Sequence, residues 1–197
     1  TLLVALAAPD MTPLILEGIL PEPNILTWRA APTVDGLRGT VQVHRKTGLH
    51  ILVGFRDPVA LGTFEAQGGP TGLANLAYTA AQAGYGILIL DISAPEIAPP
   101  ALSAANTLVL VARPDTPGVY SALQAVRLVK DVMAGQHAIP DGAIHLVLNR
   151  VRSTTLRPDE VVAYGKRERR DSPPLAAYVA DDPNVETALN RMEPAYY

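Results

Sequence analysis

Short runs of aliphatic residues, each bounded by turn-forming residues, recur along the chain and constrain its fold more than any other feature. The runs are continuous and do not alternate with polar residues, which is typical of strands in a parallel sheet that is covered on both faces. We predict strands over residues 2–6, 49–53, 87–90, 107–112, 144–148 and 176–180. Apolar residues recur with helical spacing between them, over residues 12–20, 71–83, 119–133, 158–164 and 185–191.

The alternation of strand and helix predicts an α/β fold, a doubly wound, mostly parallel sheet with helices on both faces. Helix starts are marked by Thr12 before Pro13 and by Pro158, which two acidic residues follow. Residues 21–46 show neither period, so we expect a surface excursion there with one short helix near residues 34–43. The 197 residues suffice for one sizeable core, and we expect a single domain over residues 1–197.

The composition argues against several classes of protein. A formal net charge of −3 and a pI near 5.8 do not suit a general binder of nucleic acid or membrane surfaces. Cysteine is absent, which excludes disulfides and thiolate metal sites. No apolar run reaches the roughly 18–20 residues that cross a bilayer, so we expect a cytoplasmic protein. The chain enters a strand directly after Thr1, and we expect a further segment upstream of it.

Asp91 is the strongest candidate for a functional residue. It directly follows the aliphatic run 87–90, and ligands of open parallel sheets bind at the carboxyl ends of the strands. A carboxylate at that point can hold Mg²⁺ through water and orient it against nucleotide phosphates. The alternative is structural, because an aspartate can also cap the loop that begins with Ser93.

The glycine-rich stretch 68–72, GGPTG, has the outline of a phosphate-binding loop. A genuine phosphate loop follows a strand directly and carries a lysine for the β and γ phosphates. This stretch contains no lysine, lies well after the strand predicted to end at Val53, and loses one amide donor at Pro70. We therefore interpret it as the start of a helix, capped by Thr71, that packs on the sheet.

The histidines and a basic cluster are two further candidate sites. The four histidines, His44, His50, His137 and His145, lack the spacing of metal ligands and are interpreted as packed or solvated side chains. The basic cluster of Lys166, Arg167, Arg169 and Arg170 could bind an acidic partner or DNA, but such runs are more often solvated helix ends.

Seven segments carry a resemblance to a known family: LLVAL (2–6), GILPEPNILTW (18–28), LHILVGFRDPV (49–59), YGILILDIS (85–93), NTLVLVARPDTPGVYSALQAVRLVK (106–130), LVLNRV (146–151) and VADDPNVETALNR (179–191). In this order they resemble the MinD/ParA family of deviant P-loop ATPases, and most closely its CpaE-like branch from Flp (Tad) pilus assembly. The resemblance covers almost the whole chain. It implies a P-loop NTPase-like sheet of the SIMIBI type.

The resemblance also implies a function and a site. Family members bind ATP and Mg²⁺ at a homodimer interface and use this switch to position cargo, such as a pilus or secretion apparatus, a chromosome or a plasmid, through protein partners. Asp91 would be the Walker B acid that acts on Mg²⁺ through water. Asn149 would read the adenine edge with Arg150 beside it, and Asp182 and Pro183 would lie near the base.

The sequence departs from the family pattern in two places. The first strand of the family and its lysine-bearing phosphate loop would lie upstream of Thr1, and the acidic pair after the second strand is represented by Ala5 and Ala7. Without these groups hydrolysis loses stabilisation worth several kcal/mol per group, so we expect this chain not to turn over ATP. Two hypotheses remain, an ATPase domain that lacks its phosphate loop and a non-catalytic scaffold of the same fold. A small-molecule enzyme of the same superfamily ranks last.

Overall fold

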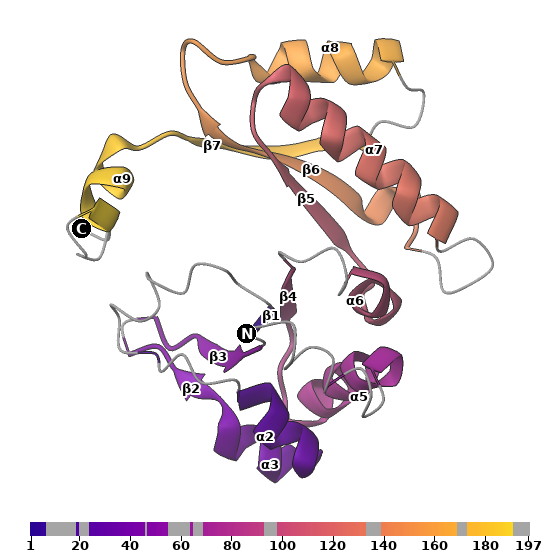
Figure 1. Cartoon of the computed structure of the whole chain (residues 1–197), viewed down its shortest axis with the longest axis vertical. Coiled ribbons are helices and arrows are strands. Elements are labelled where there is room, and N and C mark those ends of the chain that lie inside the picture. The colour runs from indigo at the N-terminus through magenta and orange to yellow at the C-terminus, as the bar shows by residue number, and fades with distance from the viewer. Residues whose placement is uncertain are drawn as a thin grey trace. The chain divides into compact units, whose positions relative to one another are not determined.

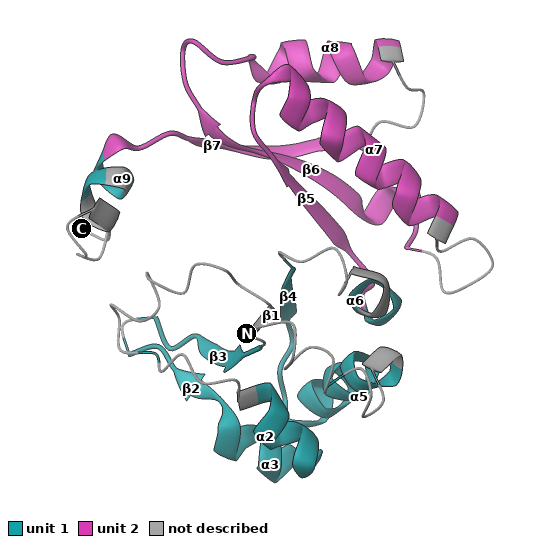
Figure 2. Cartoon of the chain, in the orientation of Figure 1, with its two compact units in different colours: residues 1–104, 184–197 teal, residues 105–183 magenta. Residues whose placement is uncertain are grey.

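The structure is a computed structural model of the whole chain. It describes residues 1–6, 19, 24–45, 47–54, 64, 69–92, 98–132, 139–168 and 173–190. The chain divides into two compact units, which Figure 2 shows in different colours. Unit 1 comprises Thr1–Ala104 and Asn184–Tyr197, and unit 2 comprises Ala105–Pro183. Each unit is described by itself below.

Unit 1 contains a four-stranded sheet in the order β2-β3-β1-β4 (Figure 1). The strands are β1 (Leu2–Leu6), β2 (Gln42–Val43), β3 (His50–Val53) and β4 (Leu88–Ile92). The central strand β1 pairs in parallel with both β3 and β4, whereas the short β2 pairs antiparallel with β3. The sheet is thus mostly parallel, as the continuous aliphatic runs predict.

The described helices of unit 1 are α2 (Asn24–Ala30), α3 (Val34–Thr40), α5 (Gly69–Gln82) and α6 (Ala98–Ala104), and α9 (Pro183–Asn190) begins at the boundary between the units. Apolar side chains of α2, α3, α5 and α6 form one core with alternate residues of the sheet, including Leu2, Val4 and Leu52. Leu3, Ile51 and Val53 belong to a second cluster with Ile19, as expected because successive side chains of a strand point to opposite faces.

Gly72 in the first turns of α5 shows why the glycine-rich stretch is structural. A Cβ at this position would lie 2.7 Å from the Phe64 Cζ, and Phe64 is itself buried. The glycine is therefore required for close packing of the helix, not for access to a phosphate. This agrees with the sequence interpretation, with one correction. The helix begins at Gly69, so Thr71 lies within its first turn and does not precede it.

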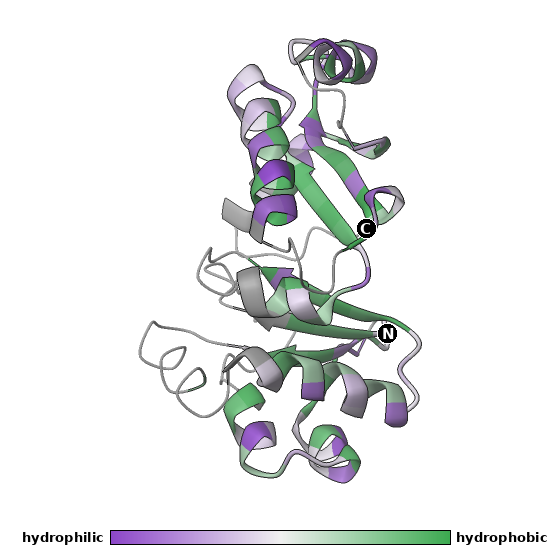
Figure 3. Ribbon diagram, turned by 90° about the vertical axis from the view of Figure 1, so that its right-hand side faces the viewer, coloured by the Kyte–Doolittle hydropathy of each residue, from purple (hydrophilic) through white to green (hydrophobic). Residues whose placement is uncertain are grey.

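Unit 2 contains a three-stranded parallel sheet, β5-β6-β7, with α7 and α8 packed on one of its faces (Figure 1). Its elements are β5 (Leu108–Ala112), α7 (Thr116–Val132), a short 3-10 helix (Asp141–Ala143), β6 (Ile144–Val151), α8 (Pro158–Glu168) and β7 (Leu175–Ala180). The core of the unit joins Leu146 and Leu148 of β6 to Val119 and Leu123 of α7 and Val161 of α8. Figure 3 shows that the strands of both units are mostly hydrophobic, whereas the helices carry both kinds of residue.

All six predicted strands are present, with ends that differ by zero to three residues. The four predicted helices that lie among the described residues are also present, and the helix predicted over residues 12–20 lies outside them. The expected excursion over residues 21–46 was only partly right. It contains α3, but also α2 and β2, which the sequence reading missed.

The continuous aliphatic run 87–90 is typical of a strand in the interior of a sheet, but β4 does not lie there. Among the described residues β4 pairs only with β1, so it is a terminal strand of its sheet. Its side chains alternate between the two faces of the sheet, since Leu88 and Leu90 pack on the core while Ile89, on the opposite face, is 46% exposed. Strand β5 is likewise terminal in its own sheet, and Val109 and Val111 are exposed. Both terminal strands consist largely of the aliphatic residues that are typical of interior strands.

Tyr85 provides a prediction about pH. Its hydroxyl lies 2.6 Å from the His50 Nδ1, and burial raises the pKa of Tyr85 above its ordinary value of 10.0 although the charge of Arg38 opposes this shift. Below pH 10 the tyrosine is protonated in the folded and unfolded chain, so its contribution to stability is fully present. As the pH rises above 10, only the unfolded chain ionises, and the free energy of unfolding should fall.

The Tyr85→Phe variant isolates this effect. We expect it to lose about 0.5–1.5 kcal/mol at pH 7 through the missing hydrogen bond, and to show a weaker decline between pH 10 and 11 than the wild type. Urea unfolding at a series of pH values measures both. An equal decline in the two proteins would assign the alkaline sensitivity to the other tyrosines.

Candidate functional site

Asp91 lies near the carboxyl end of β4, where the sequence places it, but within the strand. It is the penultimate residue of β4 and is exposed. Leu90 and Ile92 pack against the core, so the Asp91 carboxylate lies on the opposite face of the sheet, together with Ile89. An exposed carboxylate at this position can accept hydrogen bonds from the water ligands of a hydrated Mg²⁺ ion.

Strand β1 places Ala5 directly beside Asp91. The parallel register pairs Ala5 with Asp91 on one side and with Val53 on the other. The resemblance expects a carboxylate in this region of the second strand to help position the attacking water. An alanine cannot bind or orient water, so the neighbour of Asp91 lacks that chemistry. Ala7, the second position of this pair, lies outside the described residues.

Asn149 and Arg150 lie at the carboxyl end of β6, and both are exposed. The register between β6 and β7 shifts between Asn149 and Val151, and Arg150 has a φ of 63°. This is the left-handed region, which a residue with a Cβ adopts only at a cost. The irregularity interrupts the regular strand at the two residues that the resemblance assigns to the base.

Asp182 and Pro183 follow the end of β7, and Pro183 is the first residue of α9. The Asp181 amide donates to the Val151 carbonyl (3.0 Å), so the ends of β6 and β7 lie side by side. The structure therefore brings Asn149, Arg150, Asp182 and Pro183 to neighbouring strand ends of unit 2, whereas Asp91 belongs to unit 1. A structural role for Asp182 is also available, since an acidic residue before a proline at the first helical position is a common helix start.

The residues at the ends of β6 and β7 suit contact with the base of a nucleotide better than contact with its phosphates. The carboxamide of Asn149 offers one donor and one acceptor, which matches the N6 and N7 edge of adenine. In the part of the chain that the structure describes, no group of three His, Asp or Glu side chains could hold a metal ion by itself.

The other sites considered from the sequence behave as structural features. His44 is buried and hydrogen-bonds to Thr47 (2.7 Å), and His50 pairs with Tyr85, so both are packed histidines. His145 is partly buried in β6, and His137 lies outside the described residues. Of the basic cluster, Lys166 and Arg167 form the exposed last turn of α8, with Arg167 over the Tyr164 ring, and Arg169 and Arg170 lie outside the described residues.

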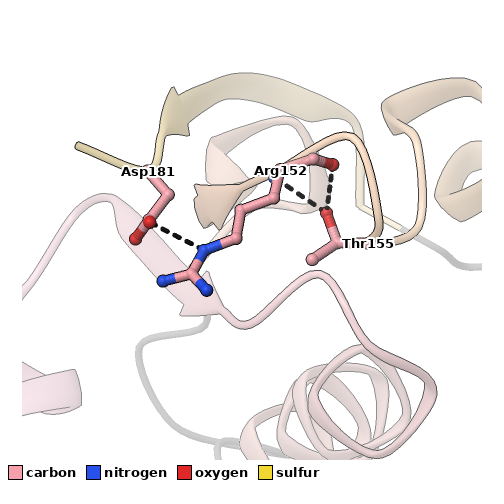
Figure 4. A network of polar contacts seen from close by, with 3 residues as sticks. All are labelled: Arg152, Thr155 and Asp181. Atoms are coloured by element: carbon pink, nitrogen blue, oxygen red, sulfur yellow. Dashed lines mark hydrogen bonds and ion pairs between the residues drawn. The ribbon is translucent and has the colours of Figure 1, made fainter. Parts of the chain in front are cut away.

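One polar network was missed by sequence reasoning. The Arg152 Nε lies 2.7 Å from the Asp181 Oδ2, and Thr155 hydrogen-bonds to both the amide and the carbonyl of Arg152 (Figure 4). The network connects the segment after β6 to the segment after β7. Its only sequence signal is the run Arg152-Ser153-Thr154-Thr155 after an aliphatic strand, which is typical of a turn and does not indicate the distant acid.

No protein-family model and no curated protein matches the sequence. Solved structures do match. A ParA family ATPase from Chlorobium tepidum has a TM-score of 0.71 at 18% identity, over 98% of this chain and 76% of the other. The cell division ATPase MinD from Pyrococcus furiosus has a TM-score of 0.67 at 17% identity, with the same coverage. An McdA–ATP complex from Cyanothece has a TM-score of 0.63 at 16% identity, also over 98% and 76%.

These neighbours confirm the expected fold class. The chain has the α/β, P-loop NTPase-like fold of the ParA, MinD and McdA structures. At this level of identity the similarity concerns the fold, and it leaves function to be argued from the residues. Among the described helices, none combines the length and the apolar composition that a membrane span requires.

Proposed function

We propose that the chain is the larger part of a MinD/ParA-type nucleotide-binding domain that positions cargo in the cell. The observation that carries the proposal is the place of Asp91, exposed near the carboxyl end of β4 and next to β1 in a parallel sheet. Nucleotides bind at this edge of open α/β sheets, because loop amides and helix N-termini converge there. The fold shared with ParA, MinD and McdA structures supports the same reading.

The proposed roles follow from the chemistry of each side chain. Asp91 would hold a hydrated Mg²⁺ ion, which supplies the positive charge that phosphates need. Asn149 would read the adenine edge, and Arg150 would lie beside it at the end of β6. Asp182 and Pro183 would border the base from the end of β7. The roles at the base come from the resemblance, and the position and chemistry of the residues support them.

We also propose that one domain spans the chain and that its first strand and phosphate loop lie outside these 197 residues. The composition of the two terminal strands, β4 and β5, supports a further strand outside this chain. Residues 88–92 and 108–112 are aliphatic apart from Asp91, and they contain no lysine or proline of the kind that protects exposed edges. Strands of this composition are stable when a further strand pairs with them.

Catalysis by the chain alone is expected to be impaired. Ala5 stands beside Asp91 where a carboxylate would help to place the attacking water, and GGPTG supplies no lysine to the phosphates. The alternative function is a non-catalytic scaffold of the same fold that localises partner proteins. The two proposals differ in whether nucleotide binds at all.

The proposed partners and location follow the resemblance. We expect a homodimer in the cytoplasm that acts with protein partners of a polar localisation or secretion system, as in the CpaE-like branch of pilus assembly. Among the similar structures, MinD of Aquifex aeolicus was solved in a complex with MinC, which illustrates a protein partner for this fold. Nucleic acid remains a minor alternative through the basic end of α8.

Titration calorimetry with Mg-ATP tests the proposal. The chain should bind with a Kd of about 1 mM or weaker, since the phosphate cradle is missing and the base contacts alone give only about 4 kcal/mol. Asp91→Ala should weaken the Mg²⁺-dependent part of the binding. Asp35→Ala, which removes an exposed acid of α3 in the same unit, should not. Micromolar affinity that disappears with Asp91→Ala would contradict the proposed impairment, and complete absence of binding would favour the scaffold.

A further inference from the structure

The segment that follows β6 is fixed at both of its ends. The amide of Arg152 donates to the Thr155 Oγ1 (3.0 Å), and that hydroxyl donates in turn to the Arg152 carbonyl (2.9 Å). The amide of the next residue, Leu156, donates to the Pro114 carbonyl after β5 (3.0 Å). The turn of residues 152–156 is therefore anchored to the neighbouring strand end as well as to itself.

The side chain of Arg152 provides the link in the other direction, to β7. Its Nε lies 2.7 Å from the Asp181 Oδ2 (Figure 4). The Asp181 side chain is only 12% exposed. A carboxylate that is mostly withdrawn from water is costly unless a donor or a charge compensates it, and the guanidinium does both. The Asp181 amide also donates to the Val151 carbonyl, so backbone and side chain of one residue both hold the end of β6.

The Arg152–Asp181 pair lies close in the sequence to the residues that are predicted to contact the base. Arg152 comes two residues after the left-handed Arg150, and Asp181 comes directly before Asp182. A strained residue such as Arg150 persists only where its surroundings determine its conformation. The contacts that directly follow the irregularity in β6 are those of residues 151, 152 and 181. The Arg152–Asp181 ion pair thus joins the two segments that carry all four predicted base-side residues.

We infer that Arg152 and Asp181 form a positioning pair, which holds the irregular end of β6 so that Asn149 and Asp182 are presented at a fixed separation. The pair does not need to touch a ligand. It acts by keeping Arg150 in the left-handed conformation and the ends of β6 and β7 together. The inference deepens the proposed nucleotide site, because that site supplies the reason for a fixed separation.

Hydrogen exchange measured by NMR on the whole chain tests the pair. In Arg152→Gln and in Asp181→Asn, the amides of residues 149–151 and 181 should exchange at least about tenfold faster, and the Asn149 side-chain amide signals should shift. The amides of residues 146 and 148 in the middle of β6 should keep their rates. The double variant should change these rates by less than the sum of the two single variants, because the two substitutions share one contact. Arg152→Lys, which retains the charge, should recover part of the protection.

The control is Arg127→Gln, which removes a 4.0 Å ion pair between two exposed side chains on α7 and should leave these rates unchanged. Unchanged exchange at residues 149–151 in Arg152→Gln would overturn the inference, and so would acceleration spread evenly along β6, which indicates general loosening. Titration with AMP separates the inference from the proposed function. If AMP fails to shift the Asn149 amide in the wild type, the base assignment is wrong, whereas the exchange result still decides the positioning role.

Discussion

Trp28→Ala should lower the free energy of unfolding by about 3–5 kcal/mol, since it removes the largest side chain of the unit 1 core. Trp28 lies in α2 with no exposed surface, packed among apolar residues that include Ile25 and Leu37. Truncation of the indole removes apolar contact and leaves a cavity that the surrounding helices can fill only in part. Small proteins have a total stability of about 5–15 kcal/mol, so this single change should remove a large part of it.

Trp28→Phe separates the volume of the ring from its polar group. Among the described residues the Trp28 Nε1 has no hydrogen-bond partner, and a buried unpaired donor costs about 1–3 kcal/mol. Phenylalanine removes this donor and keeps most of the apolar ring, so we expect a loss below about 1.5 kcal/mol. Trp28 is the only tryptophan of the chain, so urea unfolding must be followed by circular dichroism.

Tyr120→Ala is the matched control for the loss of an aromatic side chain. Tyr120 lies in α7 and is 52% exposed, and its truncation should change the stability by less than about 0.5 kcal/mol. A loss of less than about 1 kcal/mol in Trp28→Ala would mean that α2 does not pack on the sheet as described.

The same tryptophan shows where sequence reasoning stopped. Residues 21–46 show no clear period and begin with two closely spaced prolines, but α2 begins directly after Pro23, where a proline no longer interferes. Ile25 and Trp28 are three residues apart and share the buried side of this two-turn helix. A helix this short gains its stability from tertiary contacts, and those are not visible in a single sequence.

Strands were easier to predict than their ends. The aliphatic run of β6 stops at Leu148, but the strand continues to Val151 because the ladder to β7 resumes after the irregularity. Asn149 and Arg150 are polar because they are exposed, so a pattern of buried residues cannot include them. The candidate base-side residues therefore came from the resemblance, and the Arg152–Asp181 contact, across 29 positions of the chain, became visible only in three dimensions.

The phosphate side of the site leads to the prediction with the largest effect on function. A polypeptide that adds a strand and a glycine-rich, lysine-bearing loop before Thr1 should bind Mg-ATP with a Kd of about 1–10 μM, compared with about 1 mM or weaker for the present chain. This difference corresponds to roughly 3–4 kcal/mol. Backbone amides and a lysine would then surround the phosphates, and Asp91 would orient the Mg²⁺ ion. The added strand would pair with the edge of β4 that has no partner strand among the described residues.

Titration calorimetry with Mg-ATP on the longer polypeptide and on two variants of it tests this prediction. Replacement of the loop lysine by alanine should return the affinity to the millimolar range, and Asp91→Ala should reduce only the Mg²⁺-dependent part. Hydrogen exchange at the β4 amides that point to its free edge should slow, because a strand edge without a partner exchanges readily. ATP turnover should stay low even when binding is restored, since Ala5 still stands beside Asp91. If the longer polypeptide binds Mg-ATP no more tightly than the present chain, the nucleotide-binding proposal is wrong and the non-catalytic scaffold is favoured.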